Sequence, residues 1–244
     1  MILKDKNILL AVTGSIAIYK SLELIRLFIK AGANVKVILS DGAKKFINPI
    51  TFEAISQNRV LDESSESWDK SQNYNHIDIT KWADILLIAP ATANTINKIS
   101  CGIADNLLLQ TVLACKKKIL IAPAANTNMI ENPITTKSVN NLKNLGFEVL
   151  QTQTKELACK DIGNGAMLEP IDIFQITCRE LLKTSYWENR RVVLSGGGTV
   201  EKIDDVRYIS NFSSGKMASN LATALYYLGA DVTLVSSRGF ENIP

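Results

Sequence analysis

Short continuous apolar runs, separated by stretches with helical spacing, form the dominant pattern along the chain. The runs are rich in Ile, Val and Leu and occupy residues 8–12, 35–39, 85–89, 119–122, 192–194 and 232–235. A strand of a parallel sheet is covered on both faces, so it has a continuous apolar sequence instead of an alternating one. The pattern therefore predicts buried parallel strands.

The segments between these runs predict helices. Within residues 15–31 the apolar positions recur at helical spacing, at Ile18, Leu22, Ile25 and Phe28. Gly32 follows as a C-terminal stop. Repeated strand–helix–strand units imply right-handed crossovers and an α/β fold with an open, doubly wound parallel sheet. Ligands of such sheets bind beyond the carboxyl ends of the strands, so the loops that follow the strands are the expected site.

Two segments lack this periodicity. Residues 60–75 are polar, which predicts an exposed excursion, and residues 151–170 contain Gly163, Gly165 and Pro170 with little regular pattern. Loops of this length are often functional. Both segments are candidates for a mobile lid.

The chain is expected to divide near residue 188. A helical pattern covers residues 171–183, and a new strand then leads into the glycine turn Gly196–Gly198. With 244 residues the chain has room for one large domain or for one and a half domains of common size. We expect a first domain over residues 1–188 and the start of a second, Rossmann-like domain over residues 189–244, which has little apolar surface for an independent fold.

Composition and charge are those of an ordinary folded protein, with 46% hydrophobic and 21% charged residues. The net charge of +3 is spread along the chain, and its densest basic run, residues 116–118, fits a solvated turn better than a nucleic-acid patch. Four cysteines without a Cys-x-x-Cys pair fit reduced thiols in the cytoplasm better than a zinc site or disulfides. No export signal is visible, and the apolar runs are far shorter than the roughly 20 residues that cross a bilayer. Neither nucleic acid nor a membrane is expected as a partner.

Small polar residues follow three of the predicted strands. Thr13, Gly14 and Ser15 follow the first, APATANT (89–95) the third and PAAN (123–126) the fourth. A Gly-Ser turn before a helix can hold a phosphate on free N–H groups, but the same turn also serves as a plain capped helix start. His76 is the single histidine of the chain. An imidazole suits a general base at neutral pH, although a lone histidine is more often structural, and Cys159 by itself reads as a surface thiol.

Six segments together are more specific: GSIAIYK (14–20), NHIDITKWAD (75–84), APATANT (89–95), GIADNLL (102–108), PAANTNM (123–129) and ACKDIGNGAM (158–167). In this order they resemble the homo-oligomeric flavin-containing cysteine decarboxylases, and among these the phosphopantothenoylcysteine decarboxylases, over nearly all of residues 5–185. Residues 195–217, SGGGTVEKIDDVRYISNFSSGKM, are similar to the opening of phosphopantothenate–cysteine ligase, which follows the decarboxylase in bifunctional members.

The resemblance implies a flavodoxin-like fold, FMN as cofactor and 4′-phosphopantothenoyl-L-cysteine as substrate, which is decarboxylated to 4′-phosphopantetheine in coenzyme A biosynthesis. In that family the substrate thiol is oxidised by hydride transfer, the thioaldehyde loses carbon dioxide, and the enethiol is protonated and reduced. The implied assembly is a homotrimer or a larger assembly of trimers. The implied FMN contacts are Gly14, Ser15, Ile16, Ser40, Thr92, Ala93, Asn94, Thr95 and Ala124.

The resemblance also implies roles for the reacting groups. His76 matches the catalytic base, and Cys159 matches the proton donor, carried on a lid. Asn126 matches the residue that holds the substrate carboxylate, with Met129 beside it. A thiol suits proton donation because it gives and regains a proton near neutrality, and a neutral amide holds a carboxylate without adding charge.

Two positions depart from the family pattern, since Ala125 replaces the usual methionine and Ile130 the usual tryptophan. These changes bear on substrate binding more than on flavin binding. In the ligase-like segment Asn211 matches the residue associated with turnover of the acyl-cytidylate. The family's lysine and CTP contacts have no counterpart up to residue 244, so CTP- and Mg-dependent ligation is expected only in a longer chain.

Two other kinds of protein remain open as alternatives. The first is a related enzyme with the same fold, such as a peptidyl-cysteine decarboxylase or a flavin prenyltransferase. The second is a non-catalytic FMN-binding or regulatory subunit. The combination of His76, Asn126 and Cys159 favours the decarboxylase, because a pure flavin binder needs none of these three side chains.

Overall fold

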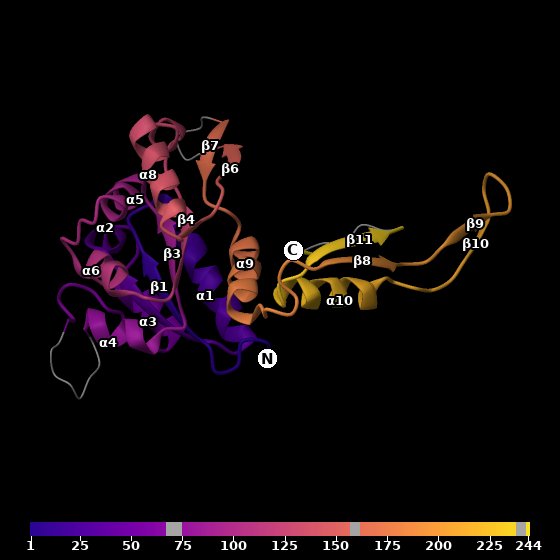
Figure 1. The fold of residues 1–244 in the computed structure, drawn as a ribbon, viewed down its shortest axis with the longest axis horizontal. Coiled ribbons are helices and arrows are strands. Elements are labelled where there is room, and N and C mark those ends of the chain that lie inside the picture. The colour runs from indigo at the N-terminus through magenta and orange to yellow at the C-terminus, as the bar shows by residue number, and fades with distance from the viewer. Residues whose placement is uncertain (67–74, 157–161, 238–242) are drawn as a thin grey trace. The chain divides into compact units, whose positions relative to one another are not determined.

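The structure is a computed structural model that describes residues 1–66, 75–156, 162–237 and 243–244. The chain forms two compact units, Met1–Phe174 and Gln175–Pro244 (Figure 1). Helix α9, Pro170–Leu182, spans the division between them. None of the helices in the described part of the chain has the length and apolar character needed to cross a bilayer.

A five-stranded parallel sheet with the order β2-β1-β3-β4-β5 forms the centre of the first unit. Its strands are β1 Asn7–Val12, β2 Asn34–Leu39, β3 Ile85–Ala91, β4 Lys118–Pro123 and β5 Glu148–Val149. Every residue of β3 is buried, as expected for a strand with helices on both faces. The predicted flavodoxin-like, doubly wound sheet is confirmed. The two-residue strand β5 is too short to leave a pattern in the sequence.

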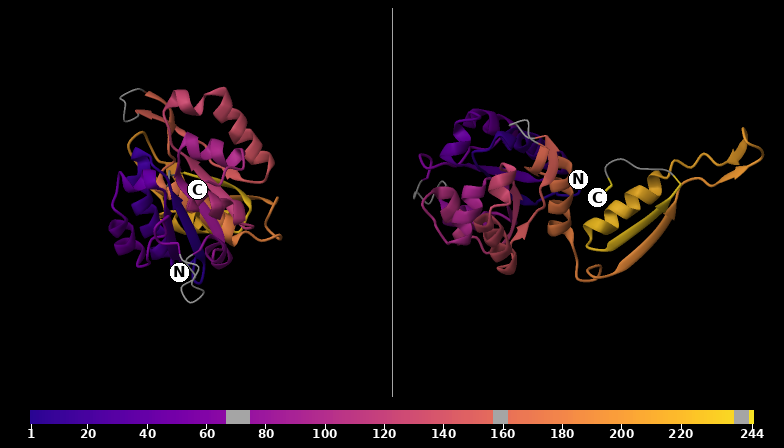
Figure 2. Two further views of the ribbon diagram at one scale, coloured as in Figure 1. Left: turned by 90° about the vertical axis from the view of Figure 1, so that its left-hand side faces the viewer. Right: turned by 90° about the horizontal axis from the view of Figure 1, so that it is seen from above.

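Two groups of helices cover the sheet on opposite faces (Figure 2). Helix α1 packs with α3, whereas α4, α5, α6 and α8 pack with one another. The helices that precede α9 in this unit are η1 Ile16–Ile18, α1 Tyr19–Ala31, α2 Asp41–Lys44, α3 Pro49–Ser56, α4 His76–Trp82, α5 Ala93–Ser100, α6 Leu107–Ala114, α7 Thr127–Ile130 and α8 Pro133–Asn144. The predicted stop of α1 is confirmed, because Gly32 has a left-handed φ of 97° and its N–H donates to the Ile29 carbonyl.

The polar segment after α3 begins inside the fold, so the predicted exposed excursion is wrong for its first residues. Val60, Leu61 and Asp62 are buried. Leu61 forms a parallel bridge with Ile38, and its carbonyl accepts from the N–H of Leu39 at 2.9 Å. Val60 and Leu61 thereby cover the free edge of β2, which would otherwise expose unpaired backbone groups. Residues 67–74 lie outside the described residues.

The second segment without periodicity contains a hairpin, which the sequence did not predict. Strands β6, Gln153–Glu156, and β7, Ile162–Ala166, pair antiparallel. Gly163 and Gly165 interrupt the alternation of apolar and polar side chains that would have predicted β7. A Cβ on Gly165 would collide with the Ala125 carbonyl in the loop after β4, and a Cβ on Gly163 would collide with the Thr127 side chain at the start of α7. Residues 157–161, which include Cys159, lie outside the described residues.

The second unit is built on a parallel pair of strands, β8 Arg191–Gly196 and β11 Asp231–Ser236, with helix α10, Lys216–Tyr227, packed against both. Both strands were predicted. A ribbon of β9, Val200–Lys202, and β10, Tyr208–Ser210, extends between β8 and α10 in the sequence. Arg179 donates to the carbonyls of Tyr226, Gly229 and Ala230 at 2.7–2.8 Å, which stabilises the end of α10.

Candidate functional site

Thr13 joins the loops that follow β1 and β3. Its side chain is buried, and Oγ1 donates to the Pro90 carbonyl at 2.7 Å and accepts from the N–H of Thr92 at 3.0 Å. The strand order reverses between β1 and β3, and in doubly wound sheets the ligand binds at such a switch point. The sequence pointed to the neighbouring residues but gave Thr13 no role of its own.

The loop after β1 approaches helix α2, which follows β2, at two glycines. A Cβ on Gly14 would lie 2.7 Å from the carbonyl carbon of Gly42, so the missing side chain is needed for the contact between the loop and α2. Ser15 Oγ caps η1 by accepting from the N–H of Ala17 at 3.3 Å, and Ser40 Oγ caps α2 in the same way from Ala43 at 3.3 Å. Both hydroxyl hydrogens remain free of these caps and can be donated to an anion.

Thr92 begins the next polar loop. Its Oγ1 accepts from the N–H of Thr95 at 3.2 Å and lies 3.0 Å from Thr95 Oγ1. Ala93 is 2% exposed, whereas Asn94 is exposed. In the first turn of α5, Asn94 is therefore the residue that faces solvent, between the buried Ala93 and Thr95.

The loop after β4 is tied to both of its neighbours. The N–H of Ala124 donates to Ala91 at 2.9 Å, and that of Ala125 donates to Gly165 of the hairpin at 3.1 Å. Asn126 begins α7, and its Oδ1 accepts from the N–H of Asn128 at 2.9 Å. Four of the predicted site segments, at residues 13–16, 40, 92–95 and 124–126, therefore share one connected edge of the sheet.

Two apolar side chains of this edge face solvent, since Ile16 is 58% and Met129 is 50% exposed. Exposed apolar groups beside polar loops are typical of ligand sites. The site fits a phosphate-bearing, flat ligand such as FMN: Ser15 and Ser40 supply hydroxyl donors. Ala93 and Ala124, two of the contacts that the resemblance implies, are almost fully buried at this edge.

His76 is the first residue of α4, and its Nδ1 lies 2.8 Å from Oε1 of Glu66. The side chains of His76 and Glu66 are 20% and 21% exposed. Asn75 caps this helix, because its Oδ1 accepts from the N–H groups of Ile77 and Asp78. The sequence predicted His76 but not Glu66, and a carboxylate ten residues away, without helical or strand spacing, gave no signal.

The turn before Glu66 is fixed at two points. Asp62 pairs with Lys44 of α2 at 2.9 Å, and the Glu63 carboxylate accepts from the N–H of Leu107 at the start of α6. Burial acts to raise the pKa of Asp62, but hydrogen bonds from Lys44 and Ser64 outweigh it and hold the pKa below its usual range. The turn thereby connects α2, α6 and the histidine.

The hairpin is anchored through a second ionic cluster. Lys20 of α1 is 9% exposed, donates to the Met167 carbonyl at 3.0 Å and pairs with Glu169 at 2.9 Å. Lys155 of β6 pairs with the same carboxylate. Burial acts to raise the pKa of Glu169, but the bonds from Lys155 and Lys20 outweigh it and lower the pKa. The β6–β7 hairpin is thus held to α1 at its base.

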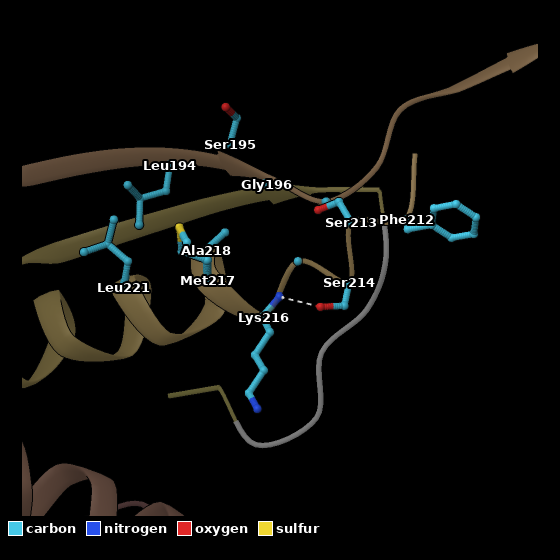
Figure 3. Close-up of a pocket in the computed structure, with 12 residues that line it drawn as sticks. Leu194, Ser195, Gly196, Phe212, Ser213, Ser214, Lys216, Met217, Ala218 and Leu221 are labelled. Carbon is cyan, nitrogen blue, oxygen red and sulfur yellow. Dashed lines mark hydrogen bonds between the residues drawn. The ribbon is translucent and has the colours of Figure 1, made fainter. Parts of the chain in front are cut away.

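A separate cavity of about 560 Å³ opens in the second unit (Figure 3). It is lined by the end of β8, by residues 212–215 and by the first turns of α10. Gly197 has a φ of 101°, and Gly215 begins α10 without a side-chain cap. Free N–H groups at a helix start favour an anion. Asn211 lies beside this turn, where its Oδ1 accepts from the N–H of Ser213 at 3.0 Å.

Comparison with known proteins agrees with this geometry. The family described as Flavoprotein matches residues 2–182, and the DNA/pantothenate metabolism flavoprotein C-terminal domain matches residues 187–243. The coenzyme A biosynthesis bifunctional protein CoaBC of Vibrio parahaemolyticus is 40% identical over 96% of the chain, and that of Bacillus subtilis 39% over 96%. The chain spans 58% of the length of each.

Solved structures add to these relatives. A PPC decarboxylase mutant complexed with pantothenoylaminoethenethiol has 32% identity and a TM-score of 0.64, covering 71% of this chain and 97% of its own. The FMN-binding protein AtHal3 has 35% identity and a TM-score of 0.64, covering 71% of this chain and 95% of its own. The chain therefore belongs to the flavoprotein family, together with PPC decarboxylase and AtHal3, and continues into a segment of the DNA/pantothenate metabolism flavoprotein type.

Proposed function

We propose that the first unit binds FMN and decarboxylates 4′-phosphopantothenoyl-L-cysteine to 4′-phosphopantetheine. The observation that carries the proposal is the connected edge formed by the loops after β1, β2, β3 and β4, in a chain whose relatives include PPC decarboxylase. We take the flavin domain to extend through residue 188. Ser15, Ser40 and the loop of Thr92–Thr95 hold the cofactor in this proposal.

The chain's own residues then handle protons and position the substrate. Bound FMN would supply a reversible hydride acceptor. His76 takes the proton of the substrate thiol. The side-chain amide of Asn126 holds the carboxylate of the substrate. Cys159, which lies outside the described residues, returns a proton to the product. Met129 and Ile16 keep water from one side of the site.

The test is anaerobic mixing of FMN-loaded protein with 4′-phosphopantothenoyl-L-cysteine, with carbon dioxide and flavin absorbance followed together. His76→Asn should lower turnover at least about 100-fold, the lower end of general-base contributions. Cys159→Ala should accumulate oxidised product with bleached flavin, whereas the matched thiol variant Cys115→Ala should behave as the unmutated protein. FMN binding without carbon dioxide release by the unmutated protein would contradict the proposal and favour a binding subunit. Selective turnover of a peptide with a C-terminal cysteine would favour a peptidyl-cysteine decarboxylase.

The cavity of the second unit supports a further role. We propose that, in a longer chain that carries the complete ligase domain, Gly196–Gly198 and the start of α10 hold a phosphate of CTP with Mg²⁺, and that Asn211 acts there as in ligases of the bifunctional relatives. A Cβ on Gly198 would lie 2.8 Å from Asn211 Oδ1. Gly198→Ala in that longer chain should therefore weaken CTP binding in calorimetry, and equal binding by both proteins would refute this placement.

The proposed assembly is a homotrimer or a larger assembly of trimers with FMN at the subunit boundary. Size-exclusion chromatography with light scattering tests it. A monomer that retains flavin would contradict the proposed assembly. It would not bear on the proposed decarboxylation, which the carbon dioxide assay tests separately.

A further inference from the structure

We propose that a cavity beside helix α7 receives the 4′-phosphate end of the substrate, and that Lys143 is the cation that distinguishes the phosphorylated compound from the unphosphorylated one. This inference rests on the proposed function and names a binding subsite within it. The cavity measures about 250 Å³ and is lined by residues of β4, α7, α8, β7 and the segment that includes β5. Sites for whole drug-sized ligands measure about 300–1,000 Å³, so this cavity suits one end of the substrate.

The cavity shares its walls with the segment that carries Asn126. Asn126 is the N-cap of α7, and Ile130 at the other end of this helix lines the cavity. Helix α7 packs against both β7 and α8. On the hairpin side Asn164 lines the cavity, and the carbonyl of the next residue, Gly165, accepts from the N–H of Ala125 at 3.1 Å. The cavity therefore begins within about one helical turn of the residue proposed to hold the substrate carboxylate.

The substrate is long enough to reach from Asn126 into this cavity. Between Asn126 and Ile130 a helix rises about 6 Å, at about 1.5 Å per residue. About eleven bonds separate the cysteine Cα of the substrate from its phosphorus, which corresponds to about 13 Å for a chain as extended as a stretched polypeptide. A substrate held at its carboxylate can therefore place its phosphate beyond α7.

The lining of the cavity matches the chemistry of this end of the substrate. Ile130, Val139 and Val149 form an apolar wall, which suits the dimethyl-substituted carbon beside the phosphate ester. Among the described residues that line the cavity, Lys143 is the only one with a charge, so no carboxylate there would repel an anion. One cation beside an apolar wall favours a ligand that joins an apolar group to an anion.

The polar groups of the cavity are available as donors. The Thr152 hydroxyl donates to Oδ1 of Asn164, which leaves the two N–H donors of that amide without an acceptor among the described residues. The ion pairs of the described chain do not include Lys143, and Glu148 of β5 pairs instead with Lys118 at 3.5 Å. Phosphate oxygens accept from ammonium and amide groups in charge-assisted hydrogen bonds.

The test compares two ligands that differ only in the phosphate. Calorimetry on FMN-loaded protein measures the binding of 4′-phosphopantetheine, the proposed product, and of pantetheine. The unmutated protein should bind the phosphorylated compound more tightly. Lys143→Met should lower the affinity for 4′-phosphopantetheine about tenfold, as expected for the loss of one charge-assisted hydrogen bond, and leave the affinity for pantetheine unchanged.

Three further variants separate charge from structure. Lys143→Arg keeps the charge and should retain the preference for the phosphorylated ligand. Asn164→Asp keeps the acceptor for Thr152 but adds a negative charge, so it should weaken binding of the phosphorylated ligand alone. Lys137→Met removes a charge from an exposed position of α8 that does not line the cavity, and it should behave as the unmutated protein.

A simpler role for Lys143 makes a different prediction. A lysine in the last turn of a helix also stabilises the helix through its dipole, but loss of that effect would lower the melting temperature without changing the preference between two ligands. In the decarboxylation assay, Lys143→Met should raise KM for 4′-phosphopantothenoyl-L-cysteine about tenfold with kcat unchanged, because the phosphate is held alike in the ground state and the transition state.

The outcomes separate this inference from the proposed function. Equal affinity of the unmutated protein for the two ligands would overturn the inference. A Lys143→Met protein that keeps the preference, or that loses affinity for both ligands alike, would also overturn it. If the unmutated protein releases no carbon dioxide, the proposed function fails, whereas the calorimetry still decides whether the cavity binds the phosphate end.

Discussion

The contact between Gly14 and Gly42 gives the sharpest test of how the proposed flavin-binding edge is built. In Gly14→Ala, the new Cβ would lie 2.7 Å from the carbonyl carbon of Gly42 and 2.9 Å from its Cα and O. All three are main-chain atoms, so no side-chain rotation can relieve the contact. Gly14 is not among the glycines with positive φ, so the expected effect is steric and not conformational.

The magnitude follows from the distance that must be gained. Carbon atoms pack best at about 3.5–4.0 Å, so either the loop of Gly14 or helix α2 must move by roughly 1 Å. Overpacking of this kind costs about 1–3 kcal/mol. For a domain of this size each kcal/mol corresponds to about 2–4 °C, so the melting temperature of the FMN-free protein should fall by about 2–12 °C. If the moved backbone loses one contact to FMN that is worth about 1.4 kcal/mol, the affinity for FMN should fall about tenfold.

The assay is thermal unfolding without flavin combined with fluorescence titration of FMN, and Gly42→Ala is the matched control. A Cβ on Gly42 would meet Gly14 Cα at 3.4 Å, an ordinary contact, and Gly42 lies in α2, where alanine is favoured over glycine by about 1 kcal/mol. The control should therefore keep or gain stability. Equal behaviour of the two variants, or unchanged FMN affinity in Gly14→Ala, would refute the steric account of this contact.

Three further predictions concern the surrounding structure. Thr13→Val removes the acceptor of the Thr92 N–H and should lower the free energy of unfolding by about 1–3 kcal/mol in urea titrations, and an unchanged value would contradict the bridging role. Because Lys44 holds the pKa of Asp62 below its unfolded value, the stability lost in Asp62→Asn should be full at pH 7 and vanish as the pH falls below about 4, which melting curves against pH can check. Burial raises the pKa of Cys178 to about 12, so a thiol reagent at pH 8 should modify it only at the rate of unfolding, and fast modification would show that this site opens.

Much of the fold follows from local sequence. The continuous apolar runs predicted β1, β2, β3 and β4, because a strand covered on both faces needs apolar residues at successive positions. Gly32 predicted the end of α1, because a left-handed cap favours glycine. The small polar residues after the strands also indicated where the site would lie, since parallel strands end at a common edge.

Other features failed to show in the sequence for identifiable reasons. The β6–β7 hairpin has glycines where an alternating pattern would need side chains, and these glycines make room for the loop after β4 at Gly165 and for the start of α7 at Gly163. Val60 and Leu61 precede a long polar run, so their burial against β2 depends on an edge strand that is distant in sequence. Local propensity carries no information about either contact.

The sequence by itself thus determined the strands β1 to β4, the end of α1, the likeness to a flavin-dependent family and the choice of His76 as a candidate base. The tertiary structure alone decided the strand order with its switch point between β1 and β3, the bridge made by Thr13, and the approach of Gly14 to Gly42. It also decided the pairing of Glu66 with His76. The hydrophobic periodicity of a sequence indicates which side of a helix or strand is buried. The contacts named above join residues of different elements and loops, which come together only when the elements pack.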